Sequence, residues 1–245
     1  EKAHTQQINN KTNVITDQKG ASMDNLHGKK AYFLVIEHIK TLFQKGELSF
    51  GEKLPSERQL MATLGLGRNS VREALRSLEN MGILESRQGQ GNFLVNHMGN
   101  SLGSIFSLLL FMEECSYPEI SQLRRSIEIG AYLLAIKNAR GPELQPLTQA
   151  LHELQNSSSP ERARADKKFH DVLVQLSGNR LLMLLNETLS QLFESAVVKT
   201  VDHISPEEWE NLMEYHVRIY QCLADQRDAD GVAAINAHYD WIEEE

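Results

Sequence analysis

Apolar side chains recur at helical spacing along most of the chain, and short polar or glycine-containing breaks separate the periodic segments. The first segment predicts a helix over residues 31–45 that ends at Gly46. A second helix is expected from the N-cap Ser56 to about Leu64, and a third over residues 69–81. The apolar positions that carry these predictions are Phe33, Ile36, Ile39, Leu42, Phe43, Val71, Ala74, Leu75 and Leu78.

The pattern changes after the third helix. Residues 83–86 and 92–95 are short strand-like segments on either side of the glycine-containing stretch 87–91, which predicts a β-hairpin. After a short link at 96–100, turn signals divide the remainder into seven expected helices: 101–115, 118–139, 142–155, 159–177, 179–202, 205–225 and 228–244. The expected fold class is mostly α, with a helix-turn-helix and hairpin domain over residues 29–96 and an all-α bundle over 101–245.

The composition is sufficient for folded domains with hydrophobic cores, since 41% of the residues are apolar. Residues 1–28 are rich in Asn, Gln, Thr and Lys and predict a disordered tail, within which Met23 is a candidate natural start. Cys115 and Cys222 lie far apart in apolar segments, which favours a reducing compartment over a disulfide framework. The sequence shows neither a signal peptide nor an apolar run of the ~18 residues that span a bilayer, so we expect a cytoplasmic protein with no membrane partner.

The net charge of −8 is unevenly distributed. Residues 29–98 carry ten Lys or Arg against seven Glu, a net charge of +3. Residues 99–245 carry 12 Lys or Arg against 23 acidic residues, a net charge of −11. Because the local field decides binding to phosphates, the first domain is the part expected to bind nucleic acid.

The third predicted helix carries the strongest DNA-binding pattern. Arg68, Arg72 and Arg76 recur every four residues and share one face, while the apolar residues line another. That arginine face is available for phosphates and guanine edges in the major groove. Hydroxyls near helix N-termini (Ser56 and Ser70) can donate to phosphate, and the glycines of the hairpin tip allow a close approach to DNA. The alternative is a solvated face with Glu73 and Glu79 as local partners.

These residues resemble the winged helix-turn-helix of GntR-family bacterial transcription regulators. The matching motifs are GxKLPSERxL from Gly51, RNSVREAL from Arg68, GIL from Gly82 and GxGxF from Gly89. The resemblance implies that Arg58, Arg68 and Arg72 contact DNA and that Ser70 contacts a phosphate. It also implies that Gly91 is the wing glycine near the minor groove. Gly67 departs from the family pattern, which usually has Ser or Thr there. The DNA-binding residues expected are Ser56, Arg58, Arg68, Asn69, Ser70, Arg72, Gln90 and Gly91.

The second domain contains a candidate metal site. Asp166 and His170 lie four residues apart beside the apolar face of one predicted helix. His216 and His238 fall on the inward faces of two later helices. An Asp and three His suit a divalent ion such as Zn²⁺, Ni²⁺ or Mn²⁺. The alternative for each histidine is a hydrogen-bonded core residue, because spacing alone does not show that the four converge.

The bundle, the Asp166-x-x-x-His170 pair and the two later histidines resemble the effector-binding domain of the FadR branch of the GntR family. In metal-containing members of that branch, one Asp and three His hold the metal, and a small carboxylate effector completes its shell. Arg124 can face inward and bind the effector carboxylate, or it can form a structural pair with Glu128. Arg125 is expected to face solvent.

The resulting functional hypothesis is a homodimeric transcription regulator, not an enzyme. It would bind a palindromic double-stranded operator, act as a repressor and respond to a small organic acid at the metal-containing site. A direct metal sensor is the first alternative, since it uses the same residues. A metal-dependent hydrolase is the second, and it lacks a recognisable general acid or base.

Overall fold

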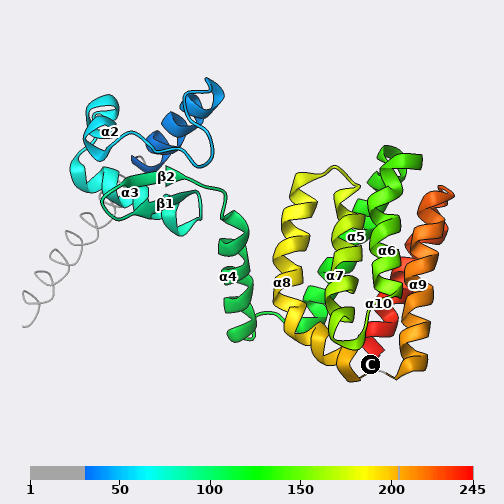
Figure 1. Ribbon diagram of the computed structural model, residues 1–245. Coiled ribbons are helices and arrows are strands. Elements are labelled where there is room, and N and C mark those ends of the chain that lie inside the picture. Colours follow the sequence, from blue (N-terminus) through cyan, green and yellow to red (C-terminus); the bar gives the residue numbers. More distant parts are fainter. Residues whose placement is uncertain (1–30, 204, 245) are drawn as a thin grey trace, which may run out of the picture. The chain divides into compact units, whose positions relative to one another are not determined.

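The computed structural model describes residues 31–203 and 205–244, with the side chains of 160, 193–203 and 244 left aside. The tail predicted for residues 1–28 lies outside these ranges. The chain divides between Ser101 and Leu102 into two compact units, and each is described by itself (Figure 1).

The N-terminal unit is a winged helix-turn-helix, as the sequence predicts. It consists of a helix over residues 31–44, α2 (Glu57–Leu64), α3 (Arg68–Asn80), β1 (Leu84–Arg87) and β2 (Gly91–Leu94). The two strands are antiparallel, with Leu84 opposite Leu94 and Arg87 opposite Gly91. Each strand lies within one residue of its predicted range. A further bridge joins Lys53 to Phe93, so the segment before α2 borders the hairpin.

The core of this unit confirms one predicted helix face and corrects another. All four apolar residues predicted on α3, from Val71 to Leu78, are buried. In the helix over 31–44, however, Phe33 is 61% exposed and Phe43 is 45% exposed. Ile39 is buried as predicted, and Val35, which was not among the predicted apolar positions, is buried with it. Residues four apart share a helix face, whereas Phe33 is turned about 200° from Val35, so the two cannot both face the core.

The C-terminal unit is an all-α bundle. α5 packs against α7, α8, α9 and α10, and α6 packs against α7 and α9 (Figure 1). No helix within the described ranges is long and apolar enough to cross a membrane. The helices are α4 (Met98–Phe111), which begins just before the boundary between the units, α5 (Tyr117–Asn138), the 3₁₀ helix η1 (Gly141–Leu144), α6 (Gln145–Gln155), α7 (Ser159–Gln175), α8 (Arg180–His203), α9 (Pro206–Ala224) and α10 (Asp228–Glu244).

Capping boxes fix where three of these helices begin. Ser116, Ser158 and Ser205 are the N-caps of α5, α7 and α9, and each is followed three residues later by a glutamate that bonds back to the cap. This reciprocal bonding satisfies backbone N–H groups that a helix start leaves free. Prolines in the first turn reinforce the same starts. The caps therefore set the register of α7 and α9, which carry three of the predicted metal ligands.

α4 differs from its prediction at both ends. The sequence predicts a link at 96–100 and a helix over 101–115, but the helix begins at Met98 and ends at Phe111. It ends early because Glu113 adopts a left-handed conformation with φ 58°. The amides of Glu113 and Glu114 then bond back to the carbonyls of Leu110 and Leu109, as in a helix C-cap.

A glycine in α10 allows a close approach to α5. A Cβ at Gly231 would lie 1.8 Å from the hydroxyl of buried Tyr132, which donates to the Arg227 carbonyl. We expect Gly231→Ala to destabilise the protein by about 2–4 kcal/mol, through overpacking and the loss of that buried hydrogen bond. Gly130→Ala is the control, since nothing lies within 4 Å of its added Cβ in α5. Urea unfolding should show Gly130→Ala to be as stable as wild type or more so.

Candidate metal centre and DNA-binding face

The turn between α2 and α3 is built by its caps. Ser56 caps α2, and its hydroxyl is engaged by Gln59 in a capping box. Gly65 ends α2 in a left-handed conformation with φ 65°. Gly67 is the N-cap of α3 and makes no side-chain cap hydrogen bond. The N-terminus of α3 therefore has free backbone N–H groups, and an anion such as phosphate can satisfy them.

The arginines predicted to bind DNA lie on an exposed face around one glutamate. The side chains of Arg68 and Arg72 are 67% and 57% exposed. Their Nε atoms lie 4.0 and 3.0 Å from the Glu57 carboxylate on α2. Exposed ion pairs of this kind contribute about 0–1 kcal/mol, so exchanging Glu57 for phosphate costs little. Arg58 and Asn69 are also exposed, and Ser70 is half-buried.

The wing places its tip residues at the surface and adds a cation that the sequence analysis missed. Gly89 and Gly91 have φ values of 71° and 105°, and Gln90 between them is exposed. The Lys53 side chain lies beside Gly91, with its Cε 3.0 Å from where a Cβ would stand. Lys53 belongs to the GxKLPSERxL motif, and only the strand bridge reveals that it reaches the wing.

The predicted metal ligands come together inside the bundle. Asp166 and His170 of α7, His216 of α9 and His238 of α10 are all buried, and one ligand atom from each lies within 4.8 Å of the others. The Nε2 of His216 is 3.0 Å from the Asp166 carboxylate and 3.2 Å from the Nε2 of His170. Metal–ligand bonds of about 2.0–2.2 Å place donor atoms within about 4.4 Å of one another. Small side-chain shifts would therefore bring all four donor atoms within bonding distance of one ion.

Hydrogen bonds on the far side of two rings assign the nitrogens that face the centre. The Nδ1 of His216 lies 2.8 Å from the Leu212 carbonyl, which can only accept, so this nitrogen carries the hydrogen. The Nδ1 of His170 lies 2.9 Å from the Glu128 carboxylate. The Nε2 atoms of the two rings therefore face each other, and a metal ion bound between them would take the place of any proton on Nε2.

His238 supplies the strongest indication that the cluster fits a metal. Its side chain is 1% exposed, and neither ring nitrogen has a hydrogen-bond partner within the part of the chain that the structure describes. A buried imidazole without partners is costly. The ring centroids of His170 and His216 lie 4.8 and 4.6 Å from that of His238. A divalent ion among the four ligands would satisfy this ring, and the N/O donor set suits Zn²⁺, Ni²⁺ or Mn²⁺.

The electrostatics of the centre favour a positive charge at His170. Burial opposes that charge, but the carboxylates of Glu128 and Asp166 raise the pKa of His170 to about 10. Burial would raise the pKa of Asp166, yet the neighbouring His170 and His216 hold it well below its ordinary value. Burial, with the histidines beside it, lowers the pKa of His238 well below its usual range. The two carboxylates thus favour one positive charge at the centre: a proton on His170 supplies it without metal, and a bound divalent ion would supply it instead. His238 stays neutral and able to ligate.

α5 contributes three charged side chains near this centre. Arg124 is 8% exposed; burial opposes its charge, but Glu128 and Asp166 are among the groups that raise its pKa. Glu128, which the sequence predicts only as a partner of Arg124, also bonds to His170 and Tyr239. The prediction for Arg125 is wrong: its side chain is only 20% exposed, and it pairs with Asp240 and Glu243 of α10. These two acidic residues lie three apart on α10, and the periodicity of α5 does not reveal that Arg125 pairs with them.

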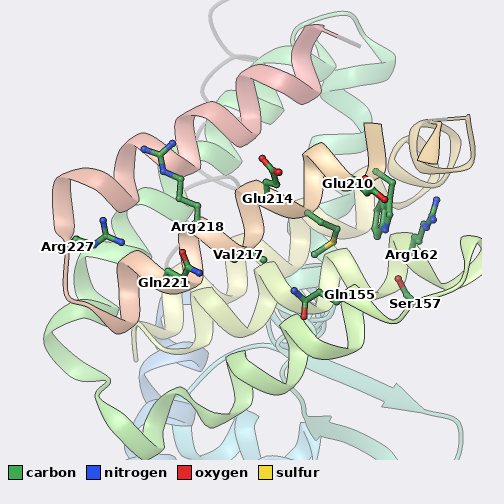
Figure 2. A pocket seen from close by; sticks show the side chains of 11 residues that line it. Gln155, Ser157, Arg162, Glu210, Glu214, Val217, Arg218, Gln221 and Arg227 are labelled. Carbon is green, nitrogen blue, oxygen red and sulfur yellow. The ribbon is translucent and has the colours of Figure 1, made fainter. Parts of the chain in front are cut away.

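A separate open groove of about 880 Å³ lies along the outer side of α9, next to α6 and the first turn of α7 (Figure 2). The Arg162 guanidinium lies 4.4 Å from the centroid of the Trp209 ring at one end. The lining carries both charge signs, from Arg162, Arg218 and Arg227 and from Glu210 and Glu214. The groove lining includes no ligand of the buried cluster, so this surface is distinct from the candidate metal centre.

A winged helix-turn-helix with exposed arginines, joined to a helical domain with a buried ligand cluster, defines a DNA-binding transcription regulator with an effector domain. Residues 32–94 match the gntR family of bacterial regulatory proteins, and residues 119–240 match the FCD domain. The chain therefore belongs to the GntR family, with a FadR-like architecture, and is a regulator rather than an enzyme.

Curated relatives align over most of this chain. The uncharacterized HTH-type transcriptional regulator YcbG of Bacillus subtilis is 31% identical over 90% of this chain and 89% of its own length. LutR, an HTH-type transcriptional regulator of the same organism, is 31% identical over 83% of this chain and 95% of its own. The repressor NanR of Klebsiella aerogenes is 28% identical over 86% and 83%. A GntR structure from Streptococcus agalactiae shares the fold, with a TM-score of 0.68 and 23% identity over 87% of this chain and 99% of that one.

Proposed function

We propose that this regulator binds a palindromic operator as a homodimer and represses transcription until a small organic acid binds at a metal-containing site in its FCD domain. The unsatisfied, buried His238 beside Asp166, His170 and His216 carries the proposal, because a divalent metal is the partner that all four share. The repressor NanR among the relatives supports repression as the output. Two-fold protein symmetry favours two half-sites.

The acid would bind between the ligand cluster and Arg124. A metal held by the four ligands supplies an electrophilic attachment point for a carboxylate oxygen. Arg124 is nearly buried on α5, and a guanidinium can bind a carboxylate through two parallel hydrogen bonds. Ligands on α7, α9 and α10 and the arginine on α5 would then share one effector. Such an effector changes operator affinity only if it binds two states of the domain differently.

Native mass spectrometry together with DNA titration tests this function. The purified protein should show a dimer mass with one divalent metal per chain. A duplex selected by the protein from a random pool serves as the operator. Acetate and malonate are the first acid probes, and an effective acid should weaken binding by about 5- to 150-fold. If EDTA alone releases the DNA and no acid has an effect, the protein is a direct metal sensor instead.

α4 offers the dimer contact. Its sequence, MGNSLGSIFSLLLF, has no charged residue, and Leu108 and Phe111 are 55% and 84% exposed. An uncharged apolar helix face of this kind marks an association site, and a second copy presents the same face. We expect Leu108→Glu to weaken the dimer by at least about 100-fold, since it buries an unpaired charge. Analytical ultracentrifugation measures the change. Leu181→Glu, at a leucine that is 70% exposed at the start of α8, should leave the dimer intact.

A further inference from the structure

Glu128 is a fully buried carboxylate that bonds to a metal-ligand histidine, His170, and to a tyrosine beside the candidate metal centre, Tyr239. It is 0% exposed in the middle of α5. Its Oε2 lies 2.9 Å from the Nδ1 of His170 on α7, and its Oε1 accepts a 2.7 Å hydrogen bond from the Tyr239 hydroxyl on α10. Both oxygens are therefore directed by specific partners on two other helices.

A buried carboxylate is costly unless its charge is used. Removing a carboxylate from water costs several kcal/mol even after relaxation, so packing alone does not account for Glu128. Its contact to the outer nitrogen of a metal-ligand histidine is the arrangement that fixes ring orientation and increases ligand basicity in protein metal sites. The Tyr239 hydroxyl restrains the other oxygen, which keeps the carboxylate pointed at His170.

We propose that Glu128 is a positioning residue for the metal centre and that Tyr239 holds Glu128 in place. Glu128 fixes the Nδ1–H tautomer of His170, so that the Nε2 lone pair faces the other three ligands. It also connects α5, which supplies none of the four ligands, to the centre. Arg124 lies one turn before Glu128 on α5, so occupancy of the centre and placement of Arg124 are linked through one helix. This inference rests on the metal site of the proposed function.

Metal affinity measured by chelator competition, with Ni²⁺ as the probe, tests the inference. Glu128→Gln should weaken Ni²⁺ binding by about 10-fold and Glu128→Ala by about 100-fold, the range found for outer-shell partners. Tyr239→Phe should fall between wild type and Glu128→Ala. In Zn²⁺-loaded protein, ¹⁵N NMR of labelled histidines should show His170 as the Nδ1–H tautomer in wild type, with that signal altered in Glu128→Gln.

Tyr132→Phe is the matched control. It also removes a buried tyrosine hydroxyl that makes one hydrogen bond, in this case to the Arg227 carbonyl. It should lower stability while leaving Ni²⁺ affinity unchanged. Wild-type affinity in both Glu128 variants would overturn the inference while leaving the proposed metal site standing. An equal loss in Tyr132→Phe would also overturn it, because the effect would then come from folding. Failure of the wild type to bind Ni²⁺ or Zn²⁺ would overturn both proposals.

Discussion

Replacing Arg68 and Arg72 together by alanine is expected to weaken operator binding by at least about 100-fold at physiological salt, because base-edge and phosphate contacts by arginine contribute about 1–3 kcal/mol each. Both side chains are more than half exposed at the start of α3. In the free protein they share Glu57, so their guanidinium groups are held together on one face. The loss should therefore exceed what two scattered surface charges produce.

Fluorescence anisotropy with the selected duplex, repeated at several salt concentrations, measures this effect. Each lost phosphate contact lowers the slope of log affinity against log salt by about 0.9, whereas a lost base contact relaxes sequence preference. Arg164→Ala/Arg180→Ala is the control, since both arginines are exposed and lie on helices of the other unit. It removes the same charge and should change affinity by less than about 3-fold. Equal binding by the α3 double variant and wild type would contradict the assignment of this face.

Local sequence patterns were sufficient to predict the winged helix-turn-helix. The apolar face of α3, the glycine turn and the hairpin are encoded within short stretches, and the structure confirms them. The buried face of the first helix could not be predicted in this way. Its apolar residues cover more than one face, so periodicity did not decide that Val35 is buried while Phe33 is exposed. Lys53 was missed for a related reason, since its place beside the wing depends on a bridge between distant segments.

The metal ligands were predictable as inward residues, and their convergence depends on how the bundle closes. Asp166 and His170 share one helix, so their proximity follows from spacing. Their approach to His216 and His238 requires the packing of α7, α9 and α10, which the structure supplies. The Glu128 contact was not predictable, because a glutamate four residues after an arginine also fits a local ion pair. Only the burial of α5 against α7 and α10 distinguishes the two.

Loss of a single ligand is expected to abolish the acid response while sparing DNA binding. His216→Ala removes a ligand whose Nε2 lies 3.0 Å from Asp166 and 3.2 Å from His170, and so leaves an incomplete set around any bound ion. We expect Ni²⁺ affinity to fall by at least about 1,000-fold, which is more than the loss of about 10- to 100-fold expected when Glu128, a residue that only supports a ligand, is replaced. Since ligand binding to the folded state adds about 2.7 kcal/mol at 100 times Kd, the rise in Tm that Ni²⁺ gives the wild type should disappear.

The control for this variant is His152→Ala, which removes an exposed histidine from α6 of the same domain. It should keep wild-type Ni²⁺ affinity, the Tm increase and the acid response. Operator affinity of His216→Ala without acid should stay within about 3-fold of wild type, because its own contacts lie inside the bundle and the DNA-binding face is built from α2, α3 and the wing. If His216→Ala keeps both the acid response and Ni²⁺ binding, the effector site does not depend on this ligand set. If it loses operator binding in parallel, the metal is needed for the folded dimer rather than for sensing the acid.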